Sequence, residues 1–259
     1  MVKDLEQKYG LILGGSSGLG YATAVKCANH GMKLIVIYRS GRAQQEAISQ
    51  CFDNLENSTD HLFINADATN DLKIPTLIEQ IKKHLGNNKL FLFLHSISKG
   101  NLKPLTGEHQ LTPADFAQTI HSMGINYYSW TQQLISNNLM ASTARFLSFT
   151  SEGNHKPMKG YAAVSAAKAT LEALTRNMAL EYAPLGITTN CIQAGVTDTE
   201  SLQRIPMYEE LKKNSLQRNP MNRLTQPQDV ANLVYLLCRP EAAFINGSVL
   251  KVDGGESLT

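Results

Sequence analysis

The chain has 259 residues, of which 42% are hydrophobic and 18% charged, and its formal net charge is +2. This ordinary composition argues against long disordered, collagen-like or coiled-coil segments. The small net charge, without a basic stripe, argues against a nucleic-acid reader. The apolar runs are far shorter than the roughly 20 residues of a membrane span, and the first residues are polar, unlike a signal peptide. We therefore expect a cytoplasmic protein with four reduced, scattered cysteines and no metal site.

Short apolar runs alternate with longer segments of helical period along the whole chain. Strands are expected at 10–14, 33–38, 61–65, 90–95, 145–150, 187–193 and 248–252. The runs 33–38 and 90–95 are apolar at consecutive positions, so helices must cover both faces of the sheet. The pattern predicts an α/β chain of repeated βαβ units: a single-domain Rossmann fold with a doubly wound, mostly parallel seven-stranded sheet. We expect one domain over 1–259, with a substrate-binding lid near 197–223.

A glycine-rich turn follows the first expected strand. Gly14, Gly18 and Gly20 lie between that strand and the start of a helix. Small residues there allow the backbone to approach a pyrophosphate, which the free N–H groups of the helix N-terminus then bind. The alternative is an ordinary tight turn, but the strand before and the helix after favour a nucleotide site.

The residues after the second expected strand indicate which nicotinamide cofactor is used. An acidic residue there would bind the adenosine ribose and repel a 2′-phosphate, but the chain has Tyr38 followed by Arg39, Ser40 and Arg42. Two guanidinium groups and a hydroxyl suit a phosphate, although such arginines can also be simply solvated. The sequence therefore predicts NADPH (NADP+) rather than NADH.

A helical segment near residue 168 carries the expected reacting groups. Tyr161 and Lys168 are seven residues apart, which places them on one helix face. Val164, four residues before Lys168, has no acid–base chemistry. Tyr127, Tyr128 and Tyr208 remain alternative proton donors.

These motifs resemble the short-chain dehydrogenase/reductase superfamily. Its common pair is Tyr-x3-Lys, whereas the Tyr-x6-Lys spacing here resembles bacterial enoyl-acyl-carrier-protein reductases, a divergent branch. The segments 93–97 (Phe-Leu-His-Ser-Ile), 194–195 (Ala-Gly) and 252–255 (Val-Asp-Gly-Gly) are similar to the same branch. Ser151 and Asn126, with Arg39, make the chain most similar to the NADPH-dependent class III type.

The resemblance implies a set of site residues. The implied catalytic residues are Tyr161, Lys168, Ser151 and Asn126. The implied cofactor contacts are Gly14, Ser16, Ser17, Gly18, Leu19, Gly20, Arg39, Ser40, Arg42, Asp67, Ala68, His95, Ser96, Ile97, Lys168, Gly195, Val196 and Thr199. Several have a structural alternative: Asp67 and Thr199 can cap helices, Asn126 can bind a nearby carbonyl, and His95 can pack at a strand end.

The spacing of tyrosine and lysine leads to a hypothesis about the reaction. In an enoyl thioester, hydride enters Cβ while charge develops on the thioester oxygen, which is two carbons away. A donor displaced from the common tyrosine position by one helical turn, about 5.4 Å, can reach that oxygen. Tyr161 is then the donor, and Lys168 binds the nicotinamide ribose and lowers the pKa of Tyr161. The alternatives are a carbonyl reductase such as 3-oxoacyl-acyl-carrier-protein reductase, and a non-catalytic NADP(H)-binding protein.

The lid segment and one helix flank indicate the substrate and assembly. Apolar residues of the lid are expected to cover an acyl chain: Leu202, Ile205, Met207, Tyr208 and Leu211. Basic residues there could meet an acyl carrier protein, or could be merely solvated: Arg204, Lys212, Lys213 and Arg218. The alanines at 162, 163, 166 and 169 suit helix packing across a two-fold axis, and the family resemblance implies a homotetramer.

Overall fold

The computed structural model describes residues 2–205 and 208–259. Within these residues, seven strands form one sheet in the order β3-β2-β1-β4-β5-β6-β7, and every neighbouring pair is parallel. The strands are β1 (Tyr9–Leu13), β2 (Lys33–Tyr38), β3 (Leu62–Asn65), β4 (Leu90–His95), β5 (Met140–Ser151), β6 (Thr188–Ala194) and β7 (Val249–Val252). The predicted Rossmann fold is confirmed. The strand order reverses direction between β1 and β4, which is where ligands bind in such sheets.

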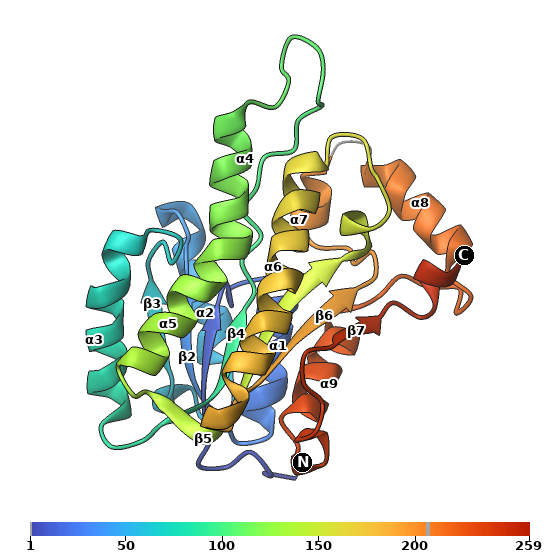
Figure 1. Cartoon of the computed structure of the whole chain (residues 1–259). Helices are drawn as coiled ribbons and strands as arrows, with labels where there is room; N and C mark the ends of the chain where they lie inside the picture. The colour runs from blue at the N-terminus through green and yellow to red at the C-terminus, as the bar shows by residue number, and fades with distance from the viewer. Residues whose placement is uncertain (1, 206–207) are drawn as a thin grey trace.

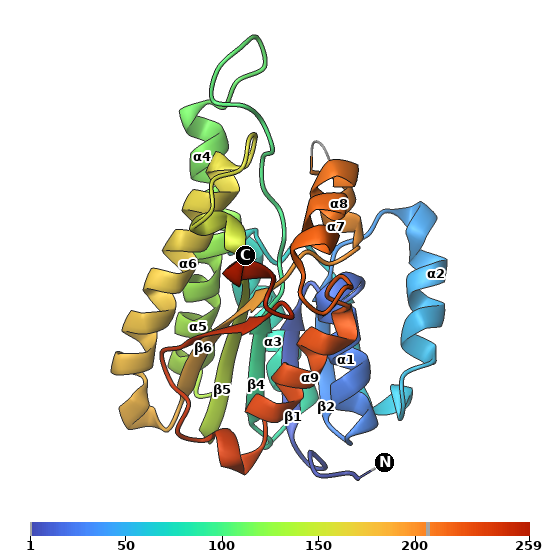
Figure 2. The same ribbon diagram turned by 90° about the vertical axis from the view of Figure 1, so that its right-hand side faces the viewer.

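Helices cover both faces of the sheet, as the continuous apolar strands require (Figures 1 and 2). One core layer lies between the sheet and α1 (Gly18–Asn29), α2 (Arg42–Asp53) and α9 (Pro227–Leu237). The other lies beneath α3 (Ile74–Leu85), α5 (Asn126–Ser136) and α6 (Ala162–Glu181). Every residue of β4 is buried, so the central strand carries side chains into both layers.

The strand β5 is longer than predicted because its pairing with β4 contains a bulge. Leu90 pairs with Met140 and Leu92 with Arg145, so four residues of β5 lie between two nearly adjacent partners. This irregular stretch breaks the apolar run from which the start at 145 was predicted. The other predicted strands differ from the structure by about one residue at an end.

Two features bring further segments to the carboxyl ends of the strands. Helix α4 (Pro113–Ile120) continues through a π-helical turn (His121–Ile125) into α5, which begins at Asn126. The predicted lid contains α7 (Glu200–Gln203) and α8 (Tyr208–Arg218), which lie beyond the tips of the strand arrows in Figure 1. Residues 206 and 207, also part of that prediction, lie outside the described residues. Among the described residues, no helix is long and apolar enough to cross a bilayer.

Candidate active site

A cavity of 1110 Å³ opens at the carboxyl ends of the strands, where the strand order reverses. Most of the predicted site residues line it: Gly14, Ser16, Ser17, Gly18, Leu19, Arg39, Asp67, Ala68, Ser96, Ile97, Ser151, Tyr161, Lys168, Gly195, Val196 and Thr199. Five predicted residues are not part of its lining: Gly20, Ser40, Arg42, His95 and Asn126. The topology therefore gathers groups from six loops into one space that is large enough for a dinucleotide and a substrate.

The glycine-rich turn has a backbone path that side chains would block. Gly14 has a φ of +82°, and a Cβ there would lie 2.4 Å from the Ser96 carbonyl oxygen. A Cβ on Gly20 would lie 2.2 Å from the Gly14 carbonyl oxygen, so Gly20 allows α1 to pack against the turn rather than contact a ligand. The Ser17 side chain does not cap α1, which leaves the first N–H groups of the helix available. This cradle fits a pyrophosphate.

The loops after β2, β3 and β4 meet at a cluster of charges. Asp67 Oδ2 is 3.2 Å from Arg39 Nη1 and 3.1 Å from Lys99 Nζ. Burial alone would raise the pKa of Asp67, but hydrogen bonds from Thr69 and Lys99 outweigh it and lower the pKa to about 2. Asp67 is therefore a carboxylate throughout the physiological range, and it does not cap the following helix, whose cap is Asn70.

Ser40 and Arg42 follow Arg39 along the chain but do not line the cavity. The Ser40 amide donates to Asn65 Oδ1 at 3.1 Å, and the exposed Arg42 is the first residue of α2. Their contact with a cofactor stays a prediction.

Ser151 and Tyr161 meet inside the cavity. Ser151, the last residue of β5, has its Oγ 3.1 Å from Tyr161 Oη. Tyr161 is the N-cap residue of α6, and its ring packs against the turn after β5, where a Cβ on Gly153 would lie 2.5 Å from the ring. Burial raises the pKa of Tyr161, opposed by the bond to Ser151, so the expectation that Lys168 lowers this pKa is not met. The phenol is neutral and can donate a hydrogen bond.

Lys168 is a buried cation on the wall of the same cavity. Its side chain lies on α6, and its Nζ donates to the Phe149 carbonyl oxygen at 2.7 Å. Burial lowers its pKa to about 8, with Glu172 and Cys191 opposing the shift. It is thus far from a solvated helix lysine, and it remains mostly charged at neutral pH.

Asn126 and His95 form a buried pair behind the cavity. Asn126 Nδ2 donates to the Ala68 carbonyl oxygen at 3.0 Å, so its Oδ1 accepts from His95 Nε2 at 3.2 Å. Burial and the charge of Lys168 lower the pKa of His95 to about 3, which keeps the imidazole neutral. Ala68 itself lines the cavity, so the pair supports the wall through this residue.

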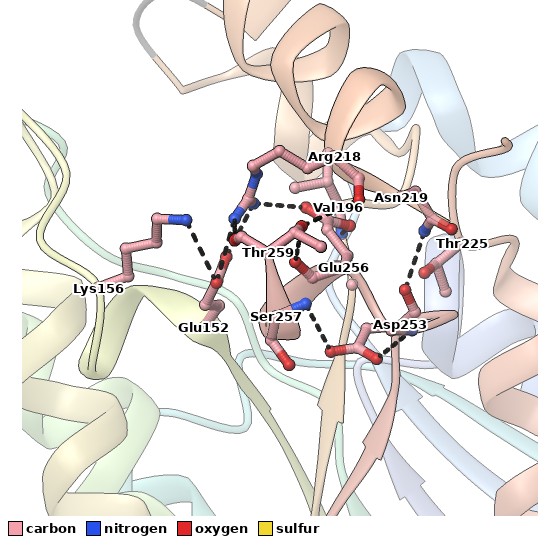
Figure 3. A network of polar contacts seen from close by, with 12 residues as sticks. Glu152, Lys156, Val196, Arg218, Asn219, Thr225, Asp253, Glu256, Ser257 and Thr259 are labelled. Atoms are coloured by element: carbon pink, nitrogen blue, oxygen red, sulfur yellow. Dashed lines mark hydrogen bonds and ion pairs between the residues drawn. The ribbon is translucent and has the colours of Figure 1, made fainter. Parts of the chain in front are cut away.

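A network of charges ties α8 to the C-terminal tail and to the turn after β5 (Figure 3). Arg218, the last residue of α8, donates to Glu152 Oε2 at 3.0 Å and to Glu256 Oε1 at 2.9 Å. The other oxygen of Glu256 accepts from the Val196 amide at 3.2 Å, in the loop after β6. The arginine expected to meet a carrier protein is therefore already paired within the chain, although it also lines the cavity.

Comparison with known proteins decides the family. The family model described as Enoyl-(Acyl carrier protein) reductase matches residues 14–257. The chain belongs to this family. The enoyl-acyl-carrier-protein reductase [NADH] of Bacillus subtilis is 26% identical over 258 residues, which cover 98% of each chain. The 7α-hydroxysteroid dehydrogenase of Escherichia coli (strain K12) is 25% identical over 252 residues, 97% of this chain and 94% of that protein.

A solved structure agrees with the fold. The Bacillus cereus enoyl-acyl-carrier-protein reductase, crystallised with NADP+ and indole naphthyridinone, has a TM-score of 0.90 at 24% identity and covers 100% of this chain and 99% of that chain. The prediction of a short-chain dehydrogenase/reductase of the enoyl reductase branch is confirmed. The protein is an oxidoreductase that uses a nicotinamide cofactor.

The part of the cavity wall next to α6 is apolar. Val164, Tyr161 and Met123 form a buried cluster, against which Leu102, Met158 and Ile205 pack. Leu202, Ile205 and Leu211 of the predicted lid line the cavity, whereas Tyr208 does not, and Met207 lies outside the described residues. Thr199 lines the cavity and also caps α7, accepting from the Leu202 amide at 3.4 Å.

Sequence reasoning missed Lys99 and Glu256. Lys99 contacts Asp67 across two strands, and the buried Glu256 joins the tail to Val196 and Arg218. In the sequence both look like surface charges. The available signal was position: Lys99 follows β4 in the loop of Ser96 and Ile97, and Glu256 follows the Val-Asp-Gly-Gly ending.

Proposed function

We propose that this protein reduces the trans-2 double bond of an enoyl thioester with NADPH, as an enoyl-acyl-carrier-protein reductase of fatty-acid biosynthesis. The observation that carries the proposal is the position of the phenol. Tyr161 and Val164 both line the cavity, but at Val164, the position of the tyrosine in the common Tyr-x3-Lys pair, the wall carries no hydroxyl, so Tyr161 supplies the phenol. A hydroxyl moved toward the helix start suits an oxygen that is remote from the carbon receiving hydride.

The residues divide the reaction between them. When bound, the nicotinamide cofactor would supply the hydride that Cβ of the enoyl group receives. Tyr161, neutral because burial raises its pKa, donates a hydrogen bond to the thioester oxygen as negative charge develops there. Ser151 Oγ, 3.1 Å from the Tyr161 hydroxyl, orients the phenol, which relays a proton from solvent to Cα as the enolate collapses. Lys168, on the cavity wall, would bind the ribose hydroxyls of the cofactor.

NADPH is proposed because of the charge after β2. Arg39 has a side chain that is 63% exposed at the cavity, and no acid follows β2 before Arg42. A guanidinium that uses one N–H on Asp67 and exposes the others can bind a 2′-phosphate through paired donors. The Bacillus subtilis relative, by its name, uses NADH. The proposal of NADPH therefore rests on the residues after β2 of this chain and not on that similarity.

The substrate and assembly follow from the same proposal. The apolar walls formed by Met158, Leu202 and Ile205 suit an acyl chain, delivered on acyl carrier protein in the cytoplasm. The segment 197–223 acts as a lid over it. A homotetramer is proposed from the resemblance, and the alanines at 162, 166 and 169 leave α6 thin where it is not fully covered; Ala163 is buried within the chain.

A second candidate is reduction of a 3-oxoacyl thioester. It is favoured by Ser151, whose hydrogen bond to the tyrosine is the arrangement expected of carbonyl reductases, and by the similarity to a hydroxysteroid dehydrogenase. Following the absorbance of NADPH with crotonyl, acetoacetyl and simple carbonyl substrates in parallel separates the two. Consumption with the crotonyl thioester alone supports the proposal, and consumption with the acetoacetyl thioester alone contradicts it. Binding of NADPH without any turnover would indicate a non-catalytic protein.

A further inference from the structure

The Asp67 carboxylate accepts four hydrogen bonds. Its Oδ1 accepts from the Thr69 amide at 3.0 Å and from the Thr69 hydroxyl at 2.6 Å. Its Oδ2 accepts from Lys99 Nζ at 3.1 Å and from Arg39 Nη1 at 3.2 Å. Lys99 also donates to Thr69 Oγ1 at 2.9 Å, which closes a small ring around the carboxylate.

Arg39 is the loosest member of this cluster. Its side chain is 63% exposed, against 34% for Lys99 and 25% for Asp67, and it contributes one N–H to the carboxylate. A single exposed ion pair of this kind stabilises weakly. Arg39 can therefore leave Asp67 for a phosphate, whereas Lys99 is held by both Asp67 and Thr69.

The charge balance shows what Lys99 contributes. Asp67 with Arg39 and Lys99 carries a net charge of about +1. When Arg39 turns away, Lys99 still balances the charge of the carboxylate, and Thr69 still donates two hydrogen bonds to it. Without Lys99 the net charge of the cluster is about zero, and Arg39 is the cation that pairs with Oδ2. The carboxylate then retains the guanidinium, and its own charge repels a 2′-phosphate.

We infer that Lys99 is a specificity-determining residue for NADPH that acts through Asp67. It neutralises the carboxylate so that Arg39 is released to the 2′-phosphate. This inference rests on the proposed cofactor preference, but it concerns binding alone. A failure of enoyl thioester reduction would therefore leave its test intact.

The test is a double-mutant cycle read by cofactor binding. Dissociation constants of NADPH and NADH are measured by nucleotide fluorescence for the wild type, Lys99→Met, Asp67→Asn and the double variant. Taking the ratio of the two constants within each variant cancels any contact of Asp67 with the adenine, which both cofactors share. Lys99→Arg, which keeps the charge, is the matched control.

We expect Lys99→Met to reduce the preference for NADPH roughly 5-fold, the size of an exposed charge interaction. Lys99→Arg should retain most of the preference, and Lys99→Met should have no effect on it in the Asp67→Asn background. An unchanged ratio in Lys99→Met would overturn the inference. So would an equal loss in the Asp67→Asn background, because Lys99 would then act on the cofactor directly. Lys99→Gln, followed with thermal unfolding, provides a second neutral variant should Lys99→Met fold poorly.

Discussion

The buried ammonium of Lys168 leads to a prediction about stability and pH. In the folded chain burial lowers its pKa to about 8, from an ordinary value of 10.5. A lowered lysine pKa means that the unfolded chain binds the proton more tightly than the folded one between these two values. The free energy of unfolding should therefore rise with pH in this window, and burial of the charge should reduce stability at neutral pH.

The size of the effect follows from the shift. At pH 7 the buried charge costs about 3 kcal/mol, and at pH 9.5 about 1 kcal/mol, so about 2 kcal/mol is recovered over this interval. Lys168→Met removes the titrating group. The unfolding free energy of the wild type, relative to that of this variant, should therefore rise by about 2 kcal/mol between the two pH values. The thiols of Cys191 and Cys238, whose pKa burial raises to about 12, titrate in both proteins and largely cancel in the comparison.

Urea unfolding of the cofactor-free protein at both pH values measures this gain. Lys168→Arg keeps its charge at both pH values and therefore removes the titration without removing the charge. The unfolding free energy of the wild type should rise relative to this variant as well between pH 7 and pH 9.5. If the difference between wild type and Lys168→Met were the same at pH 7 and pH 9.5, Lys168 would titrate as a solvated lysine. The burial of its Nζ against the Phe149 carbonyl would then be refuted.

Three further predictions concern the cavity and its supports. Tyr161→Phe should lower kcat about 100- to 1000-fold with little change in the urea midpoint, and near-normal turnover would show that another group serves the thioester oxygen. Arg39→Ala should weaken NADPH much more than NADH in fluorescence titrations, and equal weakening would remove the phosphate assignment. Glu256→Ala should cost about 2–4 kcal/mol of unfolding free energy, because Arg218 and the Val196 amide both lose a buried acceptor. Glu241→Ala is the control, because this side chain is 73% exposed, and it should leave the urea midpoint nearly unchanged. A similar loss of unfolding free energy in the two variants would show that the Glu256 network adds no stability.

The fold could be predicted because its strands are apolar on both faces. A run such as Leu34–Ile37 has no alternation of polar and apolar residues, so it fits only a sheet that is buried on both faces. The helical segments between the strands pack on these two faces. The start of β5 could not be predicted in the same way. Its first residues form a bulge opposite Leu90 and Leu92, and such pairing depends on the neighbouring strand.

The cavity wall could be predicted where backbone chemistry dictates it. Gly14 and Gly20 lie where any side chain would collide with a carbonyl oxygen, and Ser151 and Lys168 come from elements that end or begin at the same sheet edge. Lys99 could not be found, because its partner lies about 30 positions away and across two strands. The burial of Tyr161, which raises its pKa, depends on the turn after β5 packing against the ring, and the sequence does not show this contact.

The central claim is that this site reduces a carbon–carbon double bond rather than a carbonyl group. The most direct measurement offers crotonyl and acetoacetyl thioesters together in equal amounts, with NADPH deuterated at the transferring position, and identifies the labelled product by mass spectrometry. The account predicts a saturated butyryl thioester with deuterium on Cβ as the main product. A deuterated 3-hydroxybutyryl thioester in its place would contradict it.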